Sequence, residues 1–285
     1  MMPSQCEVTY ITPQYPRQLR IDSTTKCNAS CLSCHRFLTK RSGEIPWALI
    51  NTILSDISKW ANPLIEIVPV NYGEFFLHQD WYDILKAINM KLPRTQIVIP
   101  TNGSLFDDWT VEKLARIENQ MIINFSINAY YQETYEKFTG LPYQTTEKIT
   151  KAIVLLRAMK PTIRVHISMV FDPTYSTDYE RDEFIKHWSR FGQVNILPAA
   201  SAMRPDKESV IPVRIPCRSI FSDIVIGYDR RLSSCCFDSD FSISLGNYSG
   251  NLLTDWQNEY LEKLRKAHNE HHRDKYALCS RCTFA

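Results

Sequence analysis

The sequence predicts an α/β protein: a partial barrel of six parallel strand–helix units, followed by a small unit made of a β-hairpin and a helix. Short β-branched runs alternate with amphipathic segments of helical length, which is typical of parallel sheets with helical crossovers. The alternation occurs six times, too few for a closed eight-stranded barrel. After the sixth strand the pattern changes to an alternating run, a turn and a final helix.

The first unit begins with the alternating run Leu19-Arg20-Ile21-Asp22 and leads into a cysteine-rich loop. Pro46 then starts the first helix, a position that proline favours. The later units repeat this order of strand, loop and helix. The predicted strands are residues 18–22, 64–70, 95–100, 121–128, 163–171 and 194–198. The predicted helices are residues 46–60, 80–91, 109–118, 132–137 with 145–159, and 178–191.

The C-terminal part has a different pattern. Residues 203–216 are rich in Pro, Arg and Ser and predict a connection. An alternating run at 220–226, a turn at 227–231 and the pair Cys235-Cys236 predict a hairpin, and 253–268 predicts a helix. We therefore expect an N-terminal extension at 1–17, the barrel at 18–202, the connection at 203–216 and a C-terminal domain at 217–285.

Composition excludes several classes of function. Lys and Arg total 33 against 31 Asp and Glu, a net charge of +2, and no basic run with interleaved aromatics suggests nucleic acid as a partner. The N-terminus lacks the features of a signal peptide, and no window approaches the ~18 apolar residues of a membrane span. We expect a cytoplasmic protein. There the odd count of nine cysteines indicates metal or redox chemistry rather than disulfides.

Three of these cysteines lie within eight residues, at Cys27, Cys31 and Cys34. A segment this short can turn three thiolates toward one metal centre but supplies no fourth thiol, so one coordination position stays open for chemistry. The alternative is a zinc site completed by His35, since zinc also accepts three Cys and one His.

The spacing C-x3-C-x2-C resembles the cluster loop of the radical S-adenosylmethionine (SAM) enzymes. The resemblance implies a partial barrel and a 4Fe-4S cluster held by Cys27, Cys31 and Cys34, whose fourth iron binds the amino and carboxylate groups of SAM. It also implies reductive cleavage of SAM to a 5'-deoxyadenosyl radical that abstracts hydrogen from a substrate.

The same resemblance suggests SAM contacts. Gly73-Glu74 resembles the Gly-Gly-Glu segment that meets the SAM amino group, with Tyr72 in place of the first glycine. A buried carboxylate facing an ammonium is physically sensible, because each offsets the desolvation of the other. Thr139-Gly140 stands where many relatives carry Arg-Gly. The remaining candidates are Ser126 and Asn128 for the ribose and carboxylate, Lys137 in place of the missing arginine, and Met169, Val170 and Leu197 beside adenine.

A second set of cysteines, Cys217, Cys235, Cys279 and Cys282, would saturate a second 4Fe-4S cluster or close a structural zinc site. Spacing alone does not separate these alternatives. The surrounding sequence resembles the SPASM and shorter twitch extensions of radical SAM enzymes, which implies an auxiliary cluster. Arg230 stands where relatives place a turn glycine.

Three readings remain open for Cys236: a buried packing residue, the true ligand in place of Cys235, or a thiol that donates hydrogen to a substrate radical. Cys6 lies in the N-terminal extension and is expected to be inert. The histidines His268, His271 and His272 end a predicted helix, where positive charge suits the helix dipole, and we expect them at the surface.

The resemblance therefore implies an oxidoreductase that dehydrogenates, or forms a bond in, a polar small molecule or a peptide residue, with the auxiliary cluster accepting an electron. A flavodoxin or ferredoxin would supply the first electron. Few residues precede the first strand, so we expect no N-terminal domain for a peptide leader and favour a small molecule. The alternatives are an epimerase with Cys236 as hydrogen donor, and a zinc-stabilised binding protein without catalysis.

Overall fold

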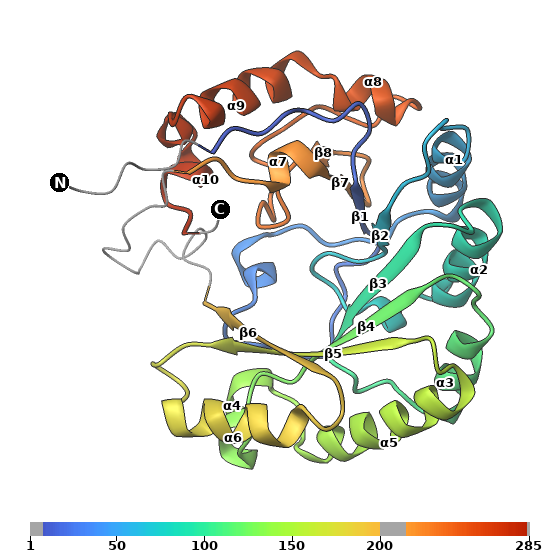
Figure 1. Ribbon diagram of the computed structural model, residues 1–285, viewed down its shortest axis with the longest axis vertical. Helices are drawn as coiled ribbons and strands as arrows, with labels where there is room; N and C mark the ends of the chain where they lie inside the picture. The colour runs from blue at the N-terminus through green and yellow to red at the C-terminus, as the bar shows by residue number, and fades with distance from the viewer. Residues whose placement is uncertain (1–7, 200–214, 284–285) are drawn as a thin grey trace.

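A computed structural model describes residues 8–199 and 215–283, and the strands of this part of the chain form one curved sheet (Figure 1). The sheet has eight strands in the order β6-β5-β4-β3-β2-β1-β7-β8. Strands β1 to β6 pair in parallel with their neighbours, as predicted for the partial barrel. The connecting helices cover the outer face of the sheet, and the segment after β1 lies inside its curve (Figure 1).

The elements of the barrel lie close to their predicted positions. The strands are β1 (Gln18–Asp22), β2 (Glu66–Val68), β3 (Gln96–Thr101), β4 (Met121–Ser126), β5 (Arg164–Phe171) and β6 (Gln193–Pro198). The helices are α1 (Trp47–Ile57), α2 (Trp81–Lys91), α3 (Asp108–Ala115), α4 (Gln132–Thr139), α5 (Gln144–Met159) and α6 (Asp178–Trp188). Short 3-10 helices η1 (His35–Leu38) and η2 (Phe75–Leu77) follow β1 and β2.

Hydrophobic periodicity explains these elements. In α1 the buried residues Ile50, Ile53, Leu54 and Ile57 recur at helical spacing and form one face against the sheet. In β3 every second residue is buried. Side chains at the helix starts satisfy free backbone donors: Asp107 accepts from Thr110 N at the start of α3, and Thr177 from Glu180 N at the start of α6.

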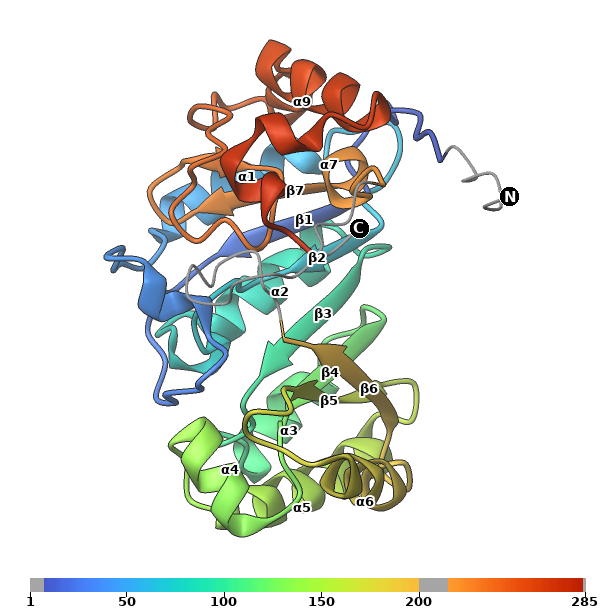
Figure 2. The same ribbon diagram turned by 90° about the vertical axis from the view of Figure 1, so that its left-hand side faces the viewer.

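The C-terminal hairpin is part of the same sheet. Its first strand, β7 (Asp223–Gly227), pairs in parallel with β1, and Leu19 lies opposite Ile224. Its second strand, β8 (Leu232–Ser233), pairs antiparallel with β7, as a hairpin requires. In Figure 2 the helices of this region lie over β7 at one end of the molecule. The predicted connection falls largely on residues 200–214, outside the described residues, as does Cys6.

Several sequence expectations were wrong in detail. The run 220–226 is not one strand, because its first half forms the short helix α7 (Ser219–Ser222). The single helix expected at 253–268 is two helices, α8 (Leu252–Trp256) and α9 (Glu259–Asn269), and the Asn258 side chain caps the second. The region ends with η3 (Arg273–Lys275) and α10 (Ala277–Ser280).

The expectation that His268 lies at the surface was also wrong: its side chain is fully buried on α9. Helical periodicity explains this, since His268 lies four residues after the buried Leu264 and shares its face. No helix in the described ranges 8–199 and 215–283 is long and apolar enough to cross a bilayer.

Candidate functional site

The cysteine loop follows β1 and is held by the end of α4. Ser30 N donates to Thr139 O at 2.8 Å, and Leu32 N donates to Phe138 O at 2.9 Å. These are terminal helix carbonyls that the helix itself leaves unpaired. Gly140 ends the helix at φ +70°, and a Cβ there would lie 2.0 Å from Ser30 Oγ. The glycine of Thr139-Gly140 therefore lets the loop approach α4.

Burial raises the pKa of all three thiols of the loop. Burial, together with the charges of the neighbouring Cys34 and Cys27, raises the pKa of Cys31 to about 12. Burial likewise raises the pKa of Cys27 and Cys34. Bound iron would reverse this, because a thiol that coordinates a metal is deprotonated and releases its proton to solvent. Three gathered thiols beside backbone donors, such as Ala29 N at 3.5 Å from Cys27 Sγ, fit an iron–sulfur cluster.

His35, the fourth ligand of the zinc alternative, is buried beside aromatic rings. Its ring centroid lies 5.4 Å from that of Phe237 and 6.3 Å from that of Tyr72. Within residues 8–199 and 215–283, no three His, Cys, Asp or Glu side chains are arranged around a position for a single metal ion.

Residues at the end of β3 also reach the loop, although no motif in the sequence marks them as functional. Asn102 Nδ2 lies 3.9 Å from Cys27 Sγ and donates to Asn28 Oδ1 at 2.9 Å. Asn28 in turn donates to Ser104 Oγ at 2.8 Å. The signal available in the sequence was a polar turn, Thr101-Asn102-Gly103, directly after a predicted strand.

Glu74 is buried beneath this turn, with 2% of its surface exposed. Its carboxylate accepts hydrogen bonds from Thr101 Oγ1 and Asn102 N, both at 2.8 Å, and burial raises its pKa to about 7. Gly73 approaches the cysteine loop so closely that a Cβ would lie 2.0 Å from Thr24 O. Gly73 thus packs against the segment that leads into the cysteine loop, and Glu74 is hydrogen-bonded to the β3 turn. Their expected contact with SAM stays a prediction.

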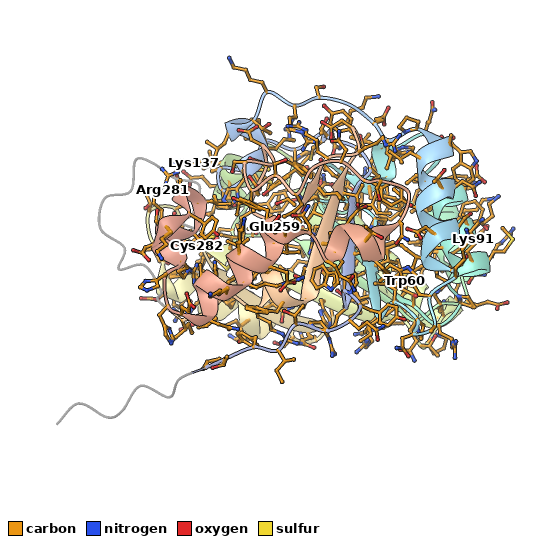
Figure 3. All side chains as sticks on the ribbon, turned by 90° about the horizontal axis from the view of Figure 1, so that it is seen from above. Trp60, Lys91, Lys137, Glu259, Arg281 and Cys282 are labelled. Carbon is orange, nitrogen blue, oxygen red and sulfur yellow. The ribbon has the colours of Figure 1, made fainter. Side chains whose placement is uncertain are left out.

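The other SAM candidates form two groups. Asn128, Ser126, Met169 and Lys137 lie in or after the strands or on α4, and Val170 and Leu197 line a cavity. Asn128, at φ +68°, is 4% exposed, and its Oδ1 accepts from Val170 N at 3.0 Å, so its side chain joins β4 to β5. Ser126 is half-buried at the end of β4, and Met169 is fully buried in the core. Lys137 is exposed on α4 (Figure 3).

Val170 and Leu197 line a cavity of about 290 Å³ inside the barrel. Cys34 of the first loop and Cys236 of the C-terminal region border the same cavity. Among the described residues that line it, Arg20 is the one with a permanent charge. The other lining residues are Ser33, His35, Asn71, Tyr72, Pro198 and Phe237. Polar and apolar side chains therefore converge between the two cysteine sets.

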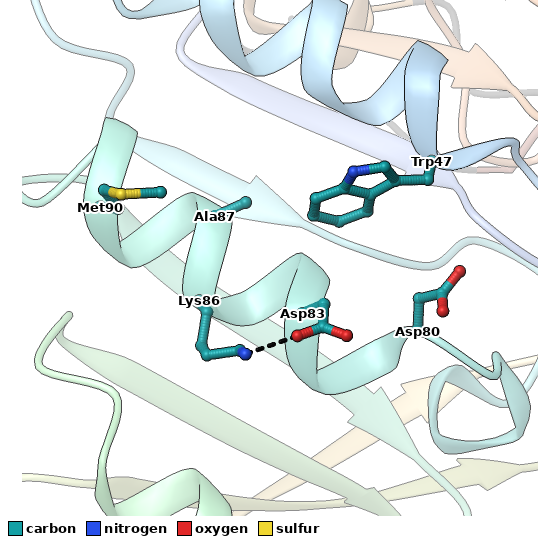
Figure 4. Close-up of a pocket in the computed structure, with 6 residues that line it drawn as sticks. All are labelled: Trp47, Asp80, Asp83, Lys86, Ala87 and Met90. Atoms are coloured by element: carbon teal, nitrogen blue, oxygen red, sulfur yellow. Dashed lines mark ion pairs between the residues drawn. The ribbon is translucent and has the colours of Figure 1, made fainter.

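A larger cavity of about 690 Å³ lies between the outer helices α1 and α2 (Figure 4). Trp47, Met90 and the Lys86–Asp83 ion pair line it. Neither cysteine set contributes to its lining, so we assign the chemistry to the smaller cavity.

The four C-terminal cysteines lie near enough to one another for their charges to interact. Burial raises the pKa of Cys279 to about 12, with the charge of Arg273 opposing this rise and Cys217 and Cys282 adding to it. Burial also raises the pKa of Cys235, and the nearby thiols, Cys279 among them, raise it further. These thiols fit a second cluster by the same reasoning as the first loop.

Cys235 and Cys236 differ in where they lie. Burial raises the pKa of both thiols, and the charge of Cys217 adds to the rise at each. The charge of Cys279 raises the pKa of Cys235 further, whereas Cys236 lines the barrel cavity, where the charge of Arg20 opposes the rise. Tyr72 Oη donates to Cys236 O at 2.5 Å. This arrangement favours Cys235 as the ligand and leaves the Cys236 thiol at the cavity.

Comparison with known families agrees with this geometry. The profile of the radical SAM superfamily matches residues 21–185, more than half of the chain. The chain belongs to the radical SAM superfamily. A second profile, the SPASM iron-sulfur cluster-binding domain, matches residues 217–283. This radical SAM protein therefore has a 4Fe-4S site for SAM and an auxiliary iron–sulfur site, and the cluster hypothesis replaces the zinc hypothesis for the first loop.

Curated relatives match only part of this radical SAM protein. A probable GTP 3',8-cyclase of Methanosarcina mazei is 29% identical over 141 residues, covering 47% of this chain and 40% of the relative. A probable GTP 3',8-cyclase of Thermoplasma volcanium is 31% identical over 137 residues, covering 47% of this chain and 39% of the relative. The chain thus spans about two fifths of the length of these relatives.

Solved structures match nearly all of the chain. BtrN in complex with AdoMet and 2-DOIA superposes with a TM-score of 0.65 at 18% identity, covering 94% of this chain and 93% of BtrN. The structure of anSMEcpe with bound AdoMet gives a TM-score of 0.70 at 15% identity, covering 94% of this chain and 89% of anSMEcpe. SuiB of Streptococcus suis bound to S-adenosylmethionine gives a TM-score of 0.63 at 17% identity, covering 88% of this chain and 68% of SuiB. These likenesses establish the shared fold.

Proposed function

We propose that this protein reductively cleaves SAM to a 5'-deoxyadenosyl radical, which abstracts hydrogen from a substrate that is then oxidised, the auxiliary cluster accepting the electron left over. One observation carries the proposal: a single cavity inside the barrel is bordered by Cys34 of the first cysteine set and by Cys236, next to Cys235 of the second. A substrate in this cavity would lie between the two cluster sites.

The chain's own contribution is to bind, orient and shield. Val170, Leu197 and Pro198 give the cavity an apolar wall, which suits an adenine ring and keeps water from the reacting carbon. Arg20 and Asn71 offer hydrogen-bond donors to a polar substrate. Holding the substrate C–H within about 3–3.5 Å of the attacking carbon is the positioning that raises the rate.

The cavity volume favours a small molecule, or one side chain of a peptide, as the substrate. SuiB bound to its precursor peptide shares this fold, as does BtrN bound to 2-DOIA, so the fold accommodates both classes. A flavodoxin or ferredoxin is the expected electron donor.

The test is anaerobic turnover of the reconstituted protein with SAM and a one-electron reductant, with 5'-deoxyadenosine measured by chromatography. We expect 5'-deoxyadenosine to form slowly without substrate. Protein that binds iron and sulfide but forms none under any reductant would contradict the proposal.

A second candidate function is epimerisation, and the thiol of Cys236 at the cavity favours it. In this reaction Cys236 returns a hydrogen to the opposite face of the substrate radical, with no net oxidation. The mass of the product separates the two reactions. Oxidation to a carbonyl removes two hydrogens, whereas epimerisation in deuterated water replaces one hydrogen of the substrate with deuterium.

A further inference from the structure

Arg41 lies where the barrel meets the C-terminal hairpin, in the segment that follows the first cysteine loop. Its Nη1 is 3.2 Å from Asp22 Oδ2 at the end of β1 and 3.2 Å from Ser239 O, and its Nη2 is 3.1 Å from Asp229 Oδ1 in the hairpin turn. The Arg41 side chain is 8% exposed and that of Asp22 is fully buried. One guanidinium thus joins three segments that are distant in sequence.

The surroundings are shaped to fit this guanidinium. Its central carbon lies 4.2 Å from the ring centroid of Phe241 and 4.8 Å from that of Tyr228. Two glycines make room: a Cβ at Gly227 would lie 2.7 Å from Arg41 Nη2, and one at Gly43 would lie 2.3 Å from the Tyr228 ring. A planar cation that stacks on rings and makes several directed hydrogen bonds is a role that lysine does not fill.

The contacts continue from Arg41 toward the cavity. Asp22 Oδ1 accepts a hydrogen bond from Tyr72 N at 3.4 Å, and Tyr72 Oη donates to Cys236 O. The loop that carries Cys235 and Cys236 is therefore held at one end by Tyr72 and at the other by Arg41, through Ser239 O. The backbone of Gly43, two residues after Arg41, pairs with Thr25 just before the first cysteine loop.

We propose that Arg41 is a positioning residue that fixes the loop of Cys235 and Cys236 against the open end of the barrel and so sets the separation of the two cysteine sets. A buried ion pair with further hydrogen bonds has few alternative geometries, and removing one partner leaves the other charge buried without compensation. The inference rests on the two cluster sites, and on the proposed function only for its effect on turnover.

The matched control is Arg231, which pairs with the same Asp229 at 2.8 Å but is 37% exposed. Exposed pairs contribute little. Comparing Arg41→Gln with Arg231→Gln therefore separates the buried contact from loss of charge in general. Arg41→Lys keeps the charge but not the fork of donors. Asp229→Ala removes the hairpin acceptor of Arg41 and also the partner of Arg231, and Arg231→Gln controls for the second loss.

The first readout is the magnetic coupling between the two reduced clusters, measured by pulsed electron paramagnetic resonance on the anaerobically reconstituted full chain. We expect one narrow distance distribution in the wild type and in Arg231→Gln, and a broadened or displaced one in Arg41→Gln. Arg41→Lys should give a distance distribution between those of the wild type and Arg41→Gln. A distribution in Arg41→Gln that is identical to that of the wild type would overturn the proposal.

The second readout is the rate at which a chelator removes iron in a Cys31→Ala background, where the C-terminal set holds the remaining cluster. We expect release to be about tenfold faster in Arg41→Gln, and within about twofold of the parent rate in Arg231→Gln. If Arg41→Gln does not fold, Asp229→Ala decides: release faster than in Arg231→Gln supports the proposal, and release at the rate of Arg231→Gln refutes it. Neither readout needs SAM cleavage, so failure to form 5'-deoxyadenosine would count against the proposed function alone.

Discussion

Two glycines give the first cysteine loop its close contact with the barrel. Gly73, after β2, approaches Thr24 O, and Gly140, after α4, approaches Ser30 Oγ. They differ in conformation, because Gly140 has φ +70° whereas Gly73 lies outside the left-handed region. At Gly73 the requirement is therefore space alone, and at Gly140 it is space together with backbone conformation.

Gly73→Ala should displace the cysteine loop, since the new Cβ would lie 2.0 Å from Thr24 O. We expect less iron at the first site after reconstitution, with the auxiliary site still filled. Gly250→Ala is the control, because Gly250 has φ +103° and open space around it. We expect this variant to lose about 1 kcal/mol of folding stability and to keep its full iron content. Iron and sulfide analysis measures both, and a fully loaded Gly73→Ala protein would refute the argument.

Asn102 is the second feature at the residue scale, because its side-chain amide lies against Cys27 Sγ. Donors near a cluster sulfur stabilise its reduced, more negative form. Asn102→Ala should therefore shift the midpoint potential of the first cluster to more negative values, by on the order of tens of millivolts.

A redox titration followed by electron paramagnetic resonance measures this shift. Ser104→Ala is the control, since it removes a neighbour of Asn102 without touching the contact with Cys27. Equal shifts in the two variants would show that the amide does not act on the thiolate.

At the scale of elements, α9 carries a buried histidine close to the auxiliary cysteines. His268 Nδ1 accepts a hydrogen bond from Cys217 N at 3.1 Å, so the proton of the neutral ring is on Nε2. Burial, together with the charge of Arg273, lowers the pKa of His268 to about 4. The helix thus presents a neutral imidazole to the backbone of the cysteine segment.

This histidine predicts a pH dependence of stability. Its pKa is about 4 in the folded chain and near 6.5 in the unfolded one, so between these values the unfolded chain binds more protons. His268 therefore makes the fold less stable as the pH falls below 6.5. In anaerobic thermal unfolding between pH 7.5 and 5.5, His268→Gln should lose less stability than the wild type. Parallel pH profiles for the two proteins would rule out this origin.

At the scale of the whole molecule, the C-terminal hairpin extends the barrel sheet through the pairing of β7 with β1. The strand that leads into the first cysteine loop is thus hydrogen-bonded to the strand of the second region. This shared edge explains why two cysteine sets about 200 residues apart lie close to one cavity, which Cys34 and Cys236 line.

The two sets should nevertheless have separable roles. Cys31→Ala should abolish formation of 5'-deoxyadenosine, because the first loop has no fourth thiol to replace it. Cys279→Ala should retain part of the cleavage while losing the product. Parallel assays of 5'-deoxyadenosine and product measure this. Full activity of the Cys31 variant would contradict the assignment of the first loop.

Much of this architecture follows from local sequence. The period of the apolar residues predicted all six barrel strands and their helices, because a parallel strand or an amphipathic helix is encoded within its own segment. The spacing of Cys27, Cys31 and Cys34 likewise predicted the cluster loop, since three ligands on one short segment need no distant partner. The helix break at Asn258 was missed, because its capping bonds compete with a continuous apolar face.

Tertiary structure decided what depends on contacts between distant segments. The apolar runs at β1 and β7 do not indicate that these strands pair. No local pattern shows that Arg41 contacts Asp229 or that Asn102 contacts Cys27. Arg230, in place of a turn glycine, adopts φ +73°, and its guanidinium donates to Tyr248 O, a contact made only in the folded chain. The sequence by itself determined the elements and the cysteine ligand spacing, whereas the cavity and its lining arose from long-range packing, because a residue's neighbours across the sheet are set by the fold.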